Sequence, residues 1–429
     1  MQMNSLLVSF ALTGIIYGLA NADLLNFEQA TQASLRRPNP LDSLLQNTPA
    51  LAAVVHKAEQ YELQVIYTRI ERNAAGEPRF RQFSYRLNDK AYFNPASLVK
   101  LPVAMLSLEK LHAIQQQVPA LSRNSIMATG VASRCQTAVP FATSADTNKV
   151  ATLGNYIKRM LLVSDNQAYN RLYKFLGQQY LHQRLAAIGY PSVRITRRFA
   201  SCDTAANRCT NPITFYSTAG NLLYHQPAAC NSSPLRPALG RVTKGRGYYQ
   251  AGKLVAQPYD FTTGNYLPLK VVNDLLRQVL FPRSADEALG INLTSADYEF
   301  LRTYLSSTPS ESGFITYASP KYFPAYKKYL YYGRQQQAQP KPSLRIYNIV
   351  GMSYGYLADC AYFADEQSGI EFMLSAVLYV NKDEVINDGR YEYTSIGLPF
   401  LKNLGQAVYE YEKAHSHAFS NRRGEAGKR

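Results

Sequence analysis

The sequence predicts an α+β protein in which one antiparallel sheet is built from both chain ends and flanked by terminal helices, with a large helical lobe inserted between them. Three observations support this prediction. Strand-like alternation occurs within the first hundred residues, helical spacing dominates the middle, and strand-like runs return near the C-terminus. Two groups of strands on either side of a helical block pair most simply in one sheet, with a cleft where the lobes meet.

The N-terminal contribution to the sheet follows a helix. Residues 41–62 have apolar side chains at helical spacing, and residues 63–71 then alternate between two faces. A turn at residues 73–78 contains glycine and proline, and residues 80–87 resume the alternation. This pattern predicts a helix followed by a β-hairpin.

The C-terminal contribution consists of three strands and a helix. Residues 344–350, 359–364 and 370–380 are rich in β-branched and aromatic side chains and are separated by turn residues. Residues 396–415 have the spacing of an amphipathic helix. These runs can complete the sheet and cover one face of it.

The chain can therefore be divided into two lobes and a tail. Residues 41–95 and 344–415 are assigned to a sheet lobe, and residues 96–343 to a helical lobe. Within the helical lobe, residues 224–332 are rich in Tyr, Pro, Gly and Arg and are expected to be an elaboration. Residues 416–429 form a basic tail that we predict to be disordered.

The first residues are typical of an export signal. Residues 1–22 carry no charge and end in Ala20, Asn21 and Ala22, a small-x-small cleavage pattern. We expect a signal peptide cut after Ala22, a mature domain of residues 23–415, and a periplasmic or secreted location. The alternative is a short membrane anchor.

Composition limits the partners. The 429 residues have a formal net charge of +16, which in an exported protein favours anionic cell-envelope polymers. The sequence has no zinc knuckle and no basic helix with interleaved aromatic residues, so nucleic acid is not expected. Its six histidines form no HExxH motif, and we predict no metal and no cofactor. We expect a monomer.

The five cysteines suit an oxidising compartment with up to two disulfides, and they fit no CxxC metal pattern. Their connectivity does not follow from the sequence. Cys202 and Cys209 are close enough in sequence to clip a loop. Cys360 lies within an apolar strand-like run and is expected to be unpaired.

A serine followed three residues later by a lysine on a helix presents both side chains on one face, which suits a nucleophile and its base. Ser97 and Lys100 have this spacing, and so do Ser107 and Lys110. Ser97 follows the run FNPA at a helix start, where its N–H is free to donate, whereas Ser107 lies within a helix. We therefore select Ser97 and Lys100. The alternative is that Lys100 is a surface lysine on an amphipathic helix.

A second polar group stands between two expected helices. Ser164, Asp165 and Asn166 follow one another at this junction. A hydroxyl there can relay a proton to a leaving group, and an amide can hold Lys100 and a substrate carbonyl. The alternative interpretation is a cluster of helix caps, which suits Asp165 best.

The runs FNPASLVKLPVAML and MLLVSDNQAYNRLY, in this order, resemble class A β-lactamases and penicillin-binding serine hydrolases. The resemblance covers these two motifs and the terminal strands, and it implies a β-lactamase/transpeptidase-like fold. It also implies that Ser97 is acylated, that Lys100 is the base, that Ser164 is the proton shuttle, and that Asn166 is a ligand to the substrate.

The family's third motif places a Lys, a Ser or Thr, and a Gly on an edge strand, where they bind the substrate carboxylate. The equivalent run here is IVGM at residues 349–352, which keeps only Gly351. Arg345 and Ser353 are candidates to replace the missing groups. The oxyanion hole uses backbone N–H groups and is expected to include that of Met352.

Class A enzymes also carry a loop Glu, with an Asn four residues later, that positions the water releasing the acyl group. Asp203 and Asn207 have this spacing, in a loop bracketed by Cys202 and Cys209. The resemblance makes Asp203 a candidate deacylation base and Asn207 a candidate substrate-binding residue. The alternative is a loop Asp that makes an Asx turn.

A rival motif lies in the same region. The run GMSYG at residues 351–355 matches G-x-S-x-G, the nucleophile elbow of α/β-hydrolases, with Asp388 and His415 following Ser353 in the required order. That motif needs a helix directly after the serine, whereas the residues that follow have turn and strand character.

We therefore expect an exported serine hydrolase that forms an acyl-enzyme with a β-lactam, a peptidoglycan peptide or an ester. In the expected reaction the N–H groups of Ser97 and Met352 hold the oxyanion. Two alternatives stay open. One is a penicillin-binding D,D-peptidase-like or non-hydrolysing cell-envelope binding protein, and the other is an α/β-hydrolase esterase that uses Ser353.

Overall fold

The computed structural model describes residues 39–283 and 290–426, with side chains described up to residue 415. It contains two units, residues 1–43 and residues 44–429. The predicted signal peptide and its cleavage site lie outside the described residues. The packing discussed below is that of the second unit.

The main sheet combines strands from both parts of the chain. Its strand order is β10-β11-β12-β1-β2, and each neighbouring pair is antiparallel. The predicted sheet architecture is therefore confirmed. The strands are β1 (Gln64–Arg72), β2 (Pro78–Tyr85), β10 (Leu344–Ser353), β11 (Tyr356–Asp365) and β12 (Ile370–Tyr379).

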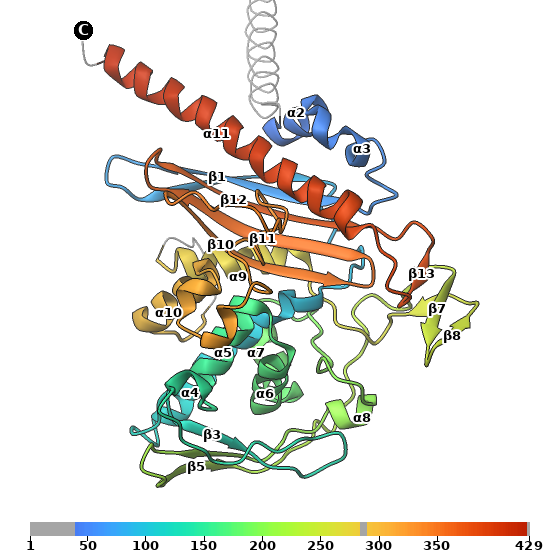
Figure 1. The fold of residues 1–429 in the computed structure, drawn as a ribbon, viewed down its shortest axis with the longest axis vertical. Coiled ribbons are helices and arrows are strands. Elements are labelled where there is room, and N and C mark those ends of the chain that lie inside the picture. The colour runs from blue at the N-terminus through green and yellow to red at the C-terminus, as the bar shows by residue number, and fades with distance from the viewer. Residues whose placement is uncertain (1–38, 284–289, 427–429) are drawn as a thin grey trace, which may run out of the picture. The chain divides into compact units, whose positions relative to one another are not determined.

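Helices cover both faces of this sheet (Figure 1). The C-terminal helix α11 (Leu398–Ala426) packs on β12 from one side, and α9 (Leu269–Leu280) packs on β11, β12 and β1 from the other. Because both faces are covered, β11 and β12 are buried along nearly their whole length and consist largely of apolar side chains.

The helical lobe is organised around α4, whose side chains are buried on almost every side. One hydrophobic cluster joins α4 residues such as Val103 to sheet residues such as Ile66 and Met373. A helix that is buried on almost every side belongs in the middle of a core, so α4 fixes the positions of the helices around it. The helices of this lobe, besides α9, are α4 (Lys100–Gln115), α5 (Leu153–Val163), α6 (Asn166–Leu176), α7 (Gln178–Ala187), α8 (Thr204–Asn207) and α10 (Ser295–Ser306).

The middle of the chain is less purely helical than its sequence predicts. It also holds short strands, too short for a clear period-2 pattern, which form small sheets and a two-stranded ladder. One of these sheets takes β13 from the C-terminal part, which pairs in parallel with β7. The strands are β3 (Ile126–Thr129), β4 (Ile213–Tyr216), β5 (Leu222–Gln226), β6 (Thr243–Lys244), β7 (Gly247–Gln250), β8 (Lys253–Val255), β9 (Tyr259–Asp260) and β13 (Val385–Ile386).

The two terminal helices differ from their predicted extents. The first, expected at residues 41–62, is divided into α2 (Pro40–Asn47), η1 (Pro49–Leu51) and α3 (Ala52–Val55). Proline disfavours a helical conformation in the residue before it, and the backbone before η1 is extended. At the other end, α11 follows a π-helical turn, η6 (Tyr393–Gly397), and continues to residue 426.

The predicted tail, residues 416–429, is therefore helical through residue 426, where disorder was expected. The extension contains no proline, and its arginine, glutamate and alanine residues favour helix while Gly424 opposes it. Adding residues to an existing helix also avoids the cost of a new nucleus.

The structure has two disulfides, Cys135–Cys202 and Cys209–Cys230. Cys360 is free and buried within β11, as predicted. Of the pairings that the sequence left open, Cys202 with Cys209 is not the one formed, since each of these cysteines pairs with a more distant partner and α8 lies between them.

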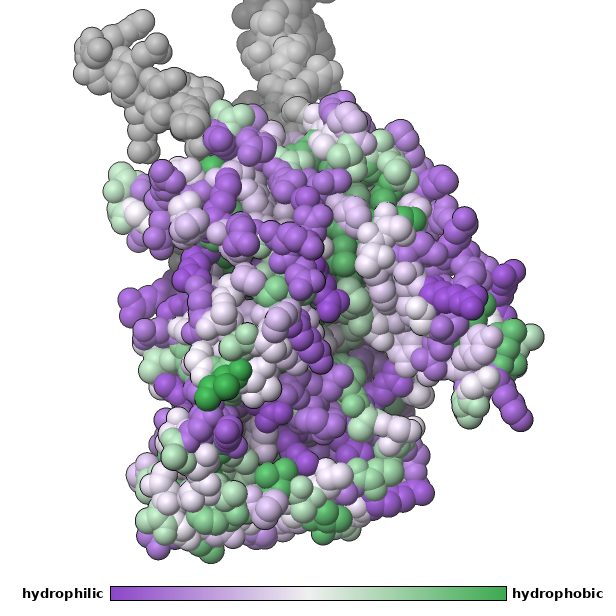
Figure 2. Space-filling model, in the orientation of Figure 1, coloured by the Kyte–Doolittle hydropathy of each residue, from purple (hydrophilic) through white to green (hydrophobic). Residues whose placement is uncertain are grey.

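Hydrophilic residues cover much of the face shown in Figure 2, and apolar residues appear there in small groups. Among the residues that the structure describes, no helix has both the length and the apolar character needed to cross a membrane. The large apolar side chains that are exposed in the described part are Val131, Phe141, Leu222, Tyr249, Leu254 and Ile315.

Replacing both Cys135 and Cys202 with serine should lower the free energy of unfolding by roughly 2–4 kcal/mol, because this disulfide closes a long loop of the unfolded chain. Denaturant unfolding without reductant measures the effect. Cys360→Ala, which removes a thiol but no disulfide, is the control and should cost less. A peptide map of the unreduced protein that joins Cys202 to Cys209 would contradict the pairing.

Candidate active site

Four polar groups meet at the end of one buried lysine. Lys100 Nζ lies 2.9 Å from Ser97 Oγ, 2.8 Å from Ser164 Oγ and 2.8 Å from Asn166 Oδ1. It also donates to the carbonyl oxygen of Ser164 at 2.5 Å. The structure thus brings together the four residues that the two motifs single out.

A strained turn places Ser97 before α4. The side chain of Asn94 accepts a hydrogen bond from the N–H of Ala96 at 2.9 Å, and Ala96 has a φ of +44°. Ala96 is the first residue of the short 3-10 helix η2 (Ala96–Val99), which is followed directly by α4. Ser97 is partly exposed, whereas the residues on both sides of it are buried. A left-handed non-glycine residue costs free energy, and such strain is common where a side chain must be aimed.

The second motif lies at the junction of α5 and α6. Ser164 ends α5 in the left-handed conformation, with φ 60° and ψ 39°. Asp165 caps α6, and its Oδ1 accepts hydrogen bonds from the N–H groups of Gln167 and Ala168 at 2.8 and 3.0 Å. The Oδ2 atom of Asp165 pairs with Arg159 at 2.6 Å. Asp165 therefore shapes the turn that holds Ser164 and Asn166, in keeping with the capping interpretation.

The environment of Lys100 favours its neutral form. Burial lowers the pKa of Lys100 well below its usual value, the positive charge of Lys327 lowers it further, and Asp165 opposes the shift. The ring of Phe199 lies 5.2 Å from Lys100 Nζ. A neutral amine that contacts a hydroxyl can accept its proton, so the pair can generate a nucleophile.

Strand β10 approaches this turn closely because of Gly351. A Cβ atom on Gly351 would lie 2.7 Å from the carbonyl oxygen of Pro95. This distance is too short for two non-bonded atoms, so any side chain at this position would force the backbone to move. The glycine therefore allows the edge strand, on which Met352 is the next residue, to pack against η2, the short helix that contains Ser97. This approach is what an oxyanion hole formed by the N–H groups of Ser97 and Met352 requires.

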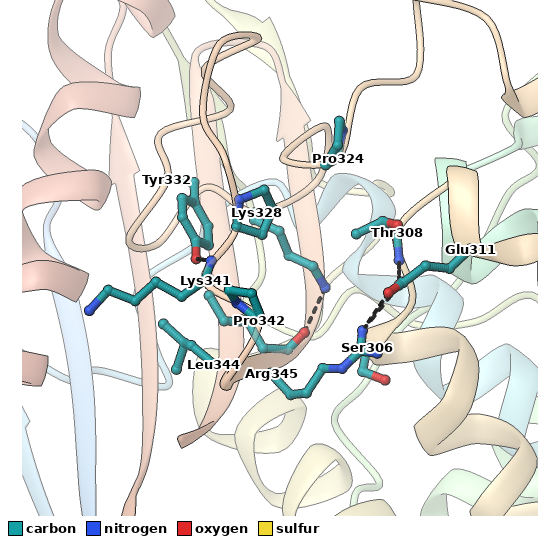
Figure 3. A pocket seen from close by; sticks show the side chains of 12 residues that line it. Ser306, Thr308, Glu311, Pro324, Lys328, Tyr332, Lys341, Pro342, Leu344 and Arg345 are labelled. Carbon is teal, nitrogen blue, oxygen red and sulfur yellow. Dashed lines mark hydrogen bonds and ion pairs between the residues drawn. The ribbon is translucent and has the colours of Figure 1, made fainter. Parts of the chain in front are cut away.

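The other strand positions supply no cation. Ile349 and Val350 are buried apolar residues. Arg345 pairs with Glu311 at 2.9 Å and precedes Gly351 by six residues, a distance of roughly 20 Å along a strand. Figure 3 shows this ion pair in the wall of a separate pocket. Arg345 therefore does not replace the missing lysine, because it lies too far away.

The rival nucleophile Ser353 lies at the end of β10. The two residues that follow, Tyr354 and Gly355, have φ values of 53° and 84° and form a tight hairpin turn into β11. A nucleophile elbow needs a helix at this point, so the α/β-hydrolase alternative is wrong. The proposed partners are engaged locally, Asp388 with the N–H of Arg390 and His415 with the carbonyl of Tyr411.

The predicted deacylation residues serve the loop instead. Asp203 caps α8 by accepting a hydrogen bond from the N–H of Ala206 at 2.8 Å, and it also forms an ion pair with Arg134. Asn207 is buried and accepts a hydrogen bond from the N–H of Arg198 at 3.2 Å. Among the contacts of the described residues, neither side chain reaches Ser97 or Lys100. The alternative of a loop-capping Asp fits Asp203 better.

The loop residue that does face the lysine is Phe199. Its N–H donates to Asn170 Oδ1 at 2.8 Å, and its carbonyl accepts from Asn170 Nδ2 at 3.4 Å. Its ring packs on Tyr169 with the ring centroids 4.6 Å apart. Neither sequence motif includes Phe199. The available signal was Asn170, which follows Asn166 by one helical turn and therefore lies on the same side of α6.

A sheet formed from both chain ends, with a buried lysine shared between two serines at its edge, is the arrangement that the resemblance of the two motifs implies. Residues 48–223 match the model of the beta-lactamase enzyme family, which confirms the resemblance predicted from the two motifs. A search of curated proteins found no match.

Similar solved structures include three β-lactamases. That from Sphaerobacter thermophilus is 12% identical, with 86% of this chain and 97% of that chain covered and a TM-score of 0.43. The enzyme from Burkholderia phymatum is 15% identical, with coverages of 86% and 98% and a TM-score of 0.43. The enzyme from Streptosporangium roseum is 14% identical, with coverages of 84% and 98% and a TM-score of 0.42.

Gly351→Ala should impair the reaction at Ser97 because the new methyl group would push β10 away from η2. We expect at least a tenfold slower acylation by a fluorescent penicillin or a chromogenic ester. A loss of roughly 1–3 kcal/mol in unfolding free energy should accompany it. Stopped-flow labelling and denaturant unfolding measure the two effects. Wild-type acylation rates in this variant would show that the close approach is not needed.

Proposed function

We propose that this protein is an exported serine hydrolase that forms an acyl-enzyme at Ser97 with a β-lactam or a related amide or ester. The observation that supports this proposal is the position of Lys100 Nζ, 2.9 Å from Ser97 Oγ and 2.8 Å from Ser164 Oγ. The lysine is fully buried while both serines are partly exposed, so a substrate can reach the hydroxyls but water does not surround the amine.

The proposed reaction begins with proton transfer from Ser97 Oγ to the neutral amine of Lys100. The oxygen attacks the substrate carbonyl, and the N–H groups of Ser97 and Met352 stabilise the developing oxyanion. Ser164 passes its hydroxyl proton to the leaving nitrogen or oxygen as the bond to the carbonyl breaks, and the protonated Lys100, which contacts Ser164 Oγ, replaces that proton and becomes neutral again. The amide of Asn166 holds Lys100 and has spare hydrogen-bonding capacity for the substrate.

Export is proposed from the apolar residues 1–22 and is supported by the two disulfides, which are typical of oxidising compartments. The excess of positive charge would favour contact with anionic cell-envelope polymers. These properties suit a substrate of the cell envelope or a β-lactam that enters it.

Incubation with a fluorescent penicillin should label the mature protein, and mass spectrometry of the peptides should place the adduct on Ser97. Ser97→Ala should abolish labelling because it removes the attacking oxygen. Ser353→Ala is the matched control and should still be labelled. An adduct on Ser353, or labelling that survives in Ser97→Ala, would overturn the assignment.

A second candidate function is a penicillin-binding protein that releases its acyl group slowly, and the position of Phe199 favours it. Hydrolysis of an acyl-enzyme needs a base that activates water. The loop residue facing Lys100 is aromatic, Asp203 is held by α8 and Arg134, and Asp165 is held by Arg159. The residues assembled here suit acylation better than deacylation.

Phe199→Glu should accelerate release of a preformed adduct by roughly tenfold or more, because it places a carboxylate where a base can activate water. Phe199→Leu is the matched control, since it removes the ring but adds no base, and it should leave the release rate close to that of the wild type. The decay of bound fluorescence after removal of free penicillin measures the rate. Rapid release from the wild-type protein would favour an efficient hydrolase instead.

A further inference from the structure

A second buried lysine reaches the junction that holds Ser164. Lys327 is only 6% exposed, and its Nζ atom donates a hydrogen bond to the carbonyl oxygen of Leu161. Leu161 lies in the last turn of α5, three residues before Ser164. Three residues are nearly one helical turn, so the two carbonyl groups are about 5 Å apart along the helix axis.

The backbone around Lys327 is fixed by two neighbouring strands. Asn348 on β10 donates through Nδ2 to the carbonyl oxygen of Lys327 at 2.7 Å and to Asp359 Oδ1 at 2.9 Å. Asp359 on β11 in turn accepts hydrogen bonds from the N–H groups of Tyr329 and Leu330 at 3.1 and 2.9 Å. Buried amide and carboxylate groups that are this fully bonded hold a segment in one position.

The adjacent lysine takes a different direction. Lys328 Nζ donates to Asn348 Oδ1 at 2.8 Å, to the carbonyl of Ile346 at 2.6 Å and to the carbonyl of Leu305 at 3.1 Å. Figure 3 shows its side chain beside the pocket that contains Arg345. Of these two consecutive buried lysines, Lys327 is therefore the one that contacts α5.

The C-terminus of α5 thus holds two amines. Its last carbonyl groups lack partners within the helix, and the helix dipole makes this end negative. Lys100 donates a hydrogen bond to the carbonyl oxygen of Ser164, and Lys327 donates one to the carbonyl oxygen of Leu161. Two positive charges so close together repel each other, so a charged Lys327 favours the neutral form of Lys100.

We propose that Lys327, which lies in the segment before β10, supplies a positive charge beside Ser164 and Lys100 and is a positioning residue for the reaction at Ser97. Strand β10 does not supply this charge, because Ile349 stands where the family's third motif has a lysine. This inference rests on the proposed function. Lys327 acts through Lys100 and the turn at Ser164, since its own side chain contacts the helix carbonyl. The third motif of the family is thereby divided, with the glycine on the strand and the charge on a neighbouring segment.

The charges around the two lysines agree with this role. Burial lowers the pKa of Lys327 to about 8, with Asp359 opposing the shift, so Lys327 is largely protonated at pH 7. Burial, together with the positive charge of Lys327, lowers the pKa of Lys328 to about 7. The carboxylate that acts on Lys100, Asp165, is already paired with Arg159.

The pH dependence of acylation tests this proposal in the full-length mature protein. Acylation should rise with pH as Lys100 loses its proton. Lys327→Met should move the midpoint upward by roughly one pH unit, which means about tenfold slower acylation on the acid side of the profile. Lys327→Arg should restore much of the wild-type profile because it keeps the charge. Lys328→Met, the matched control, should lower thermal stability but leave the midpoint in place.

A second measurement follows Lys100 directly and needs no substrate. In protein labelled with 13C at the lysine ε carbons, the Lys100 signal, assigned from Lys100→Gln, should titrate at a higher pH in Lys327→Met than in the wild type. An unchanged Lys100 midpoint in Lys327→Met, or an equal shift in Lys328→Met, would overturn the inference. If no probe acylates the wild type, the proposed function fails, and this titration still decides the role of Lys327.

Discussion

The structure depends on keeping one amine, that of Lys100, out of water. Burying a lysine costs free energy unless its hydrogen-bonding groups are satisfied, and the same burial makes the amine a base near neutral pH. Helix α4 carries the lysine into the core, and the end of α5 and the start of α6 provide its acceptors. The fold and the chemistry therefore depend on the same arrangement. The helices must pack together to bury the amine of Lys100, and the ends of α5 and α6 must accept its hydrogen bonds.

The turns that build this site include strained backbone positions. Ala96, Ser164 and Tyr354 each have a positive φ, although none is glycine. They lie before the nucleophile, at the carbonyl that binds Lys100, and in the hairpin that ends the edge strand. Such conformations persist only where surrounding contacts determine them. The close contact of Gly351 with Pro95 joins the first of these turns to the edge strand.

The sequence predicts the parts of the site that depend on short-range geometry. Ser97 and Lys100 share one helix face because of their spacing, and Ser164 and Asn166 flank a single capping residue. The pattern of strands at the two chain ends likewise predicts the main sheet. Long-range hydrogen bonds to Asn170 and Asn348 place Phe199 and Lys327. The helical spacing of Asn166 and Asn170 marks an amide on the site's side of α6, but no local period identifies the distant residue that it binds. For the same reason spacing could not decide whether Asp203, a candidate from the resemblance, reaches the site or caps the loop, and its contacts with α8 and Arg134 fit the loop-capping alternative.

The site also shows that a charge and the backbone that supports it need not come from the same segment. In β10, Ile349 and Val350 are used for packing, while Gly351 keeps the contact with η2. A long lysine side chain from elsewhere can still bring its ammonium group to the end of α5, provided that its backbone is held firmly. Asn348 and Asp359 hold it, and both lie on the sheet that also positions Met352. The sheet thus influences the charge at Lys100 by holding the backbone of Lys327, although β10 itself contributes no charged side chain to the site. For this reason the third motif looks incomplete when only the residues of the strand are considered.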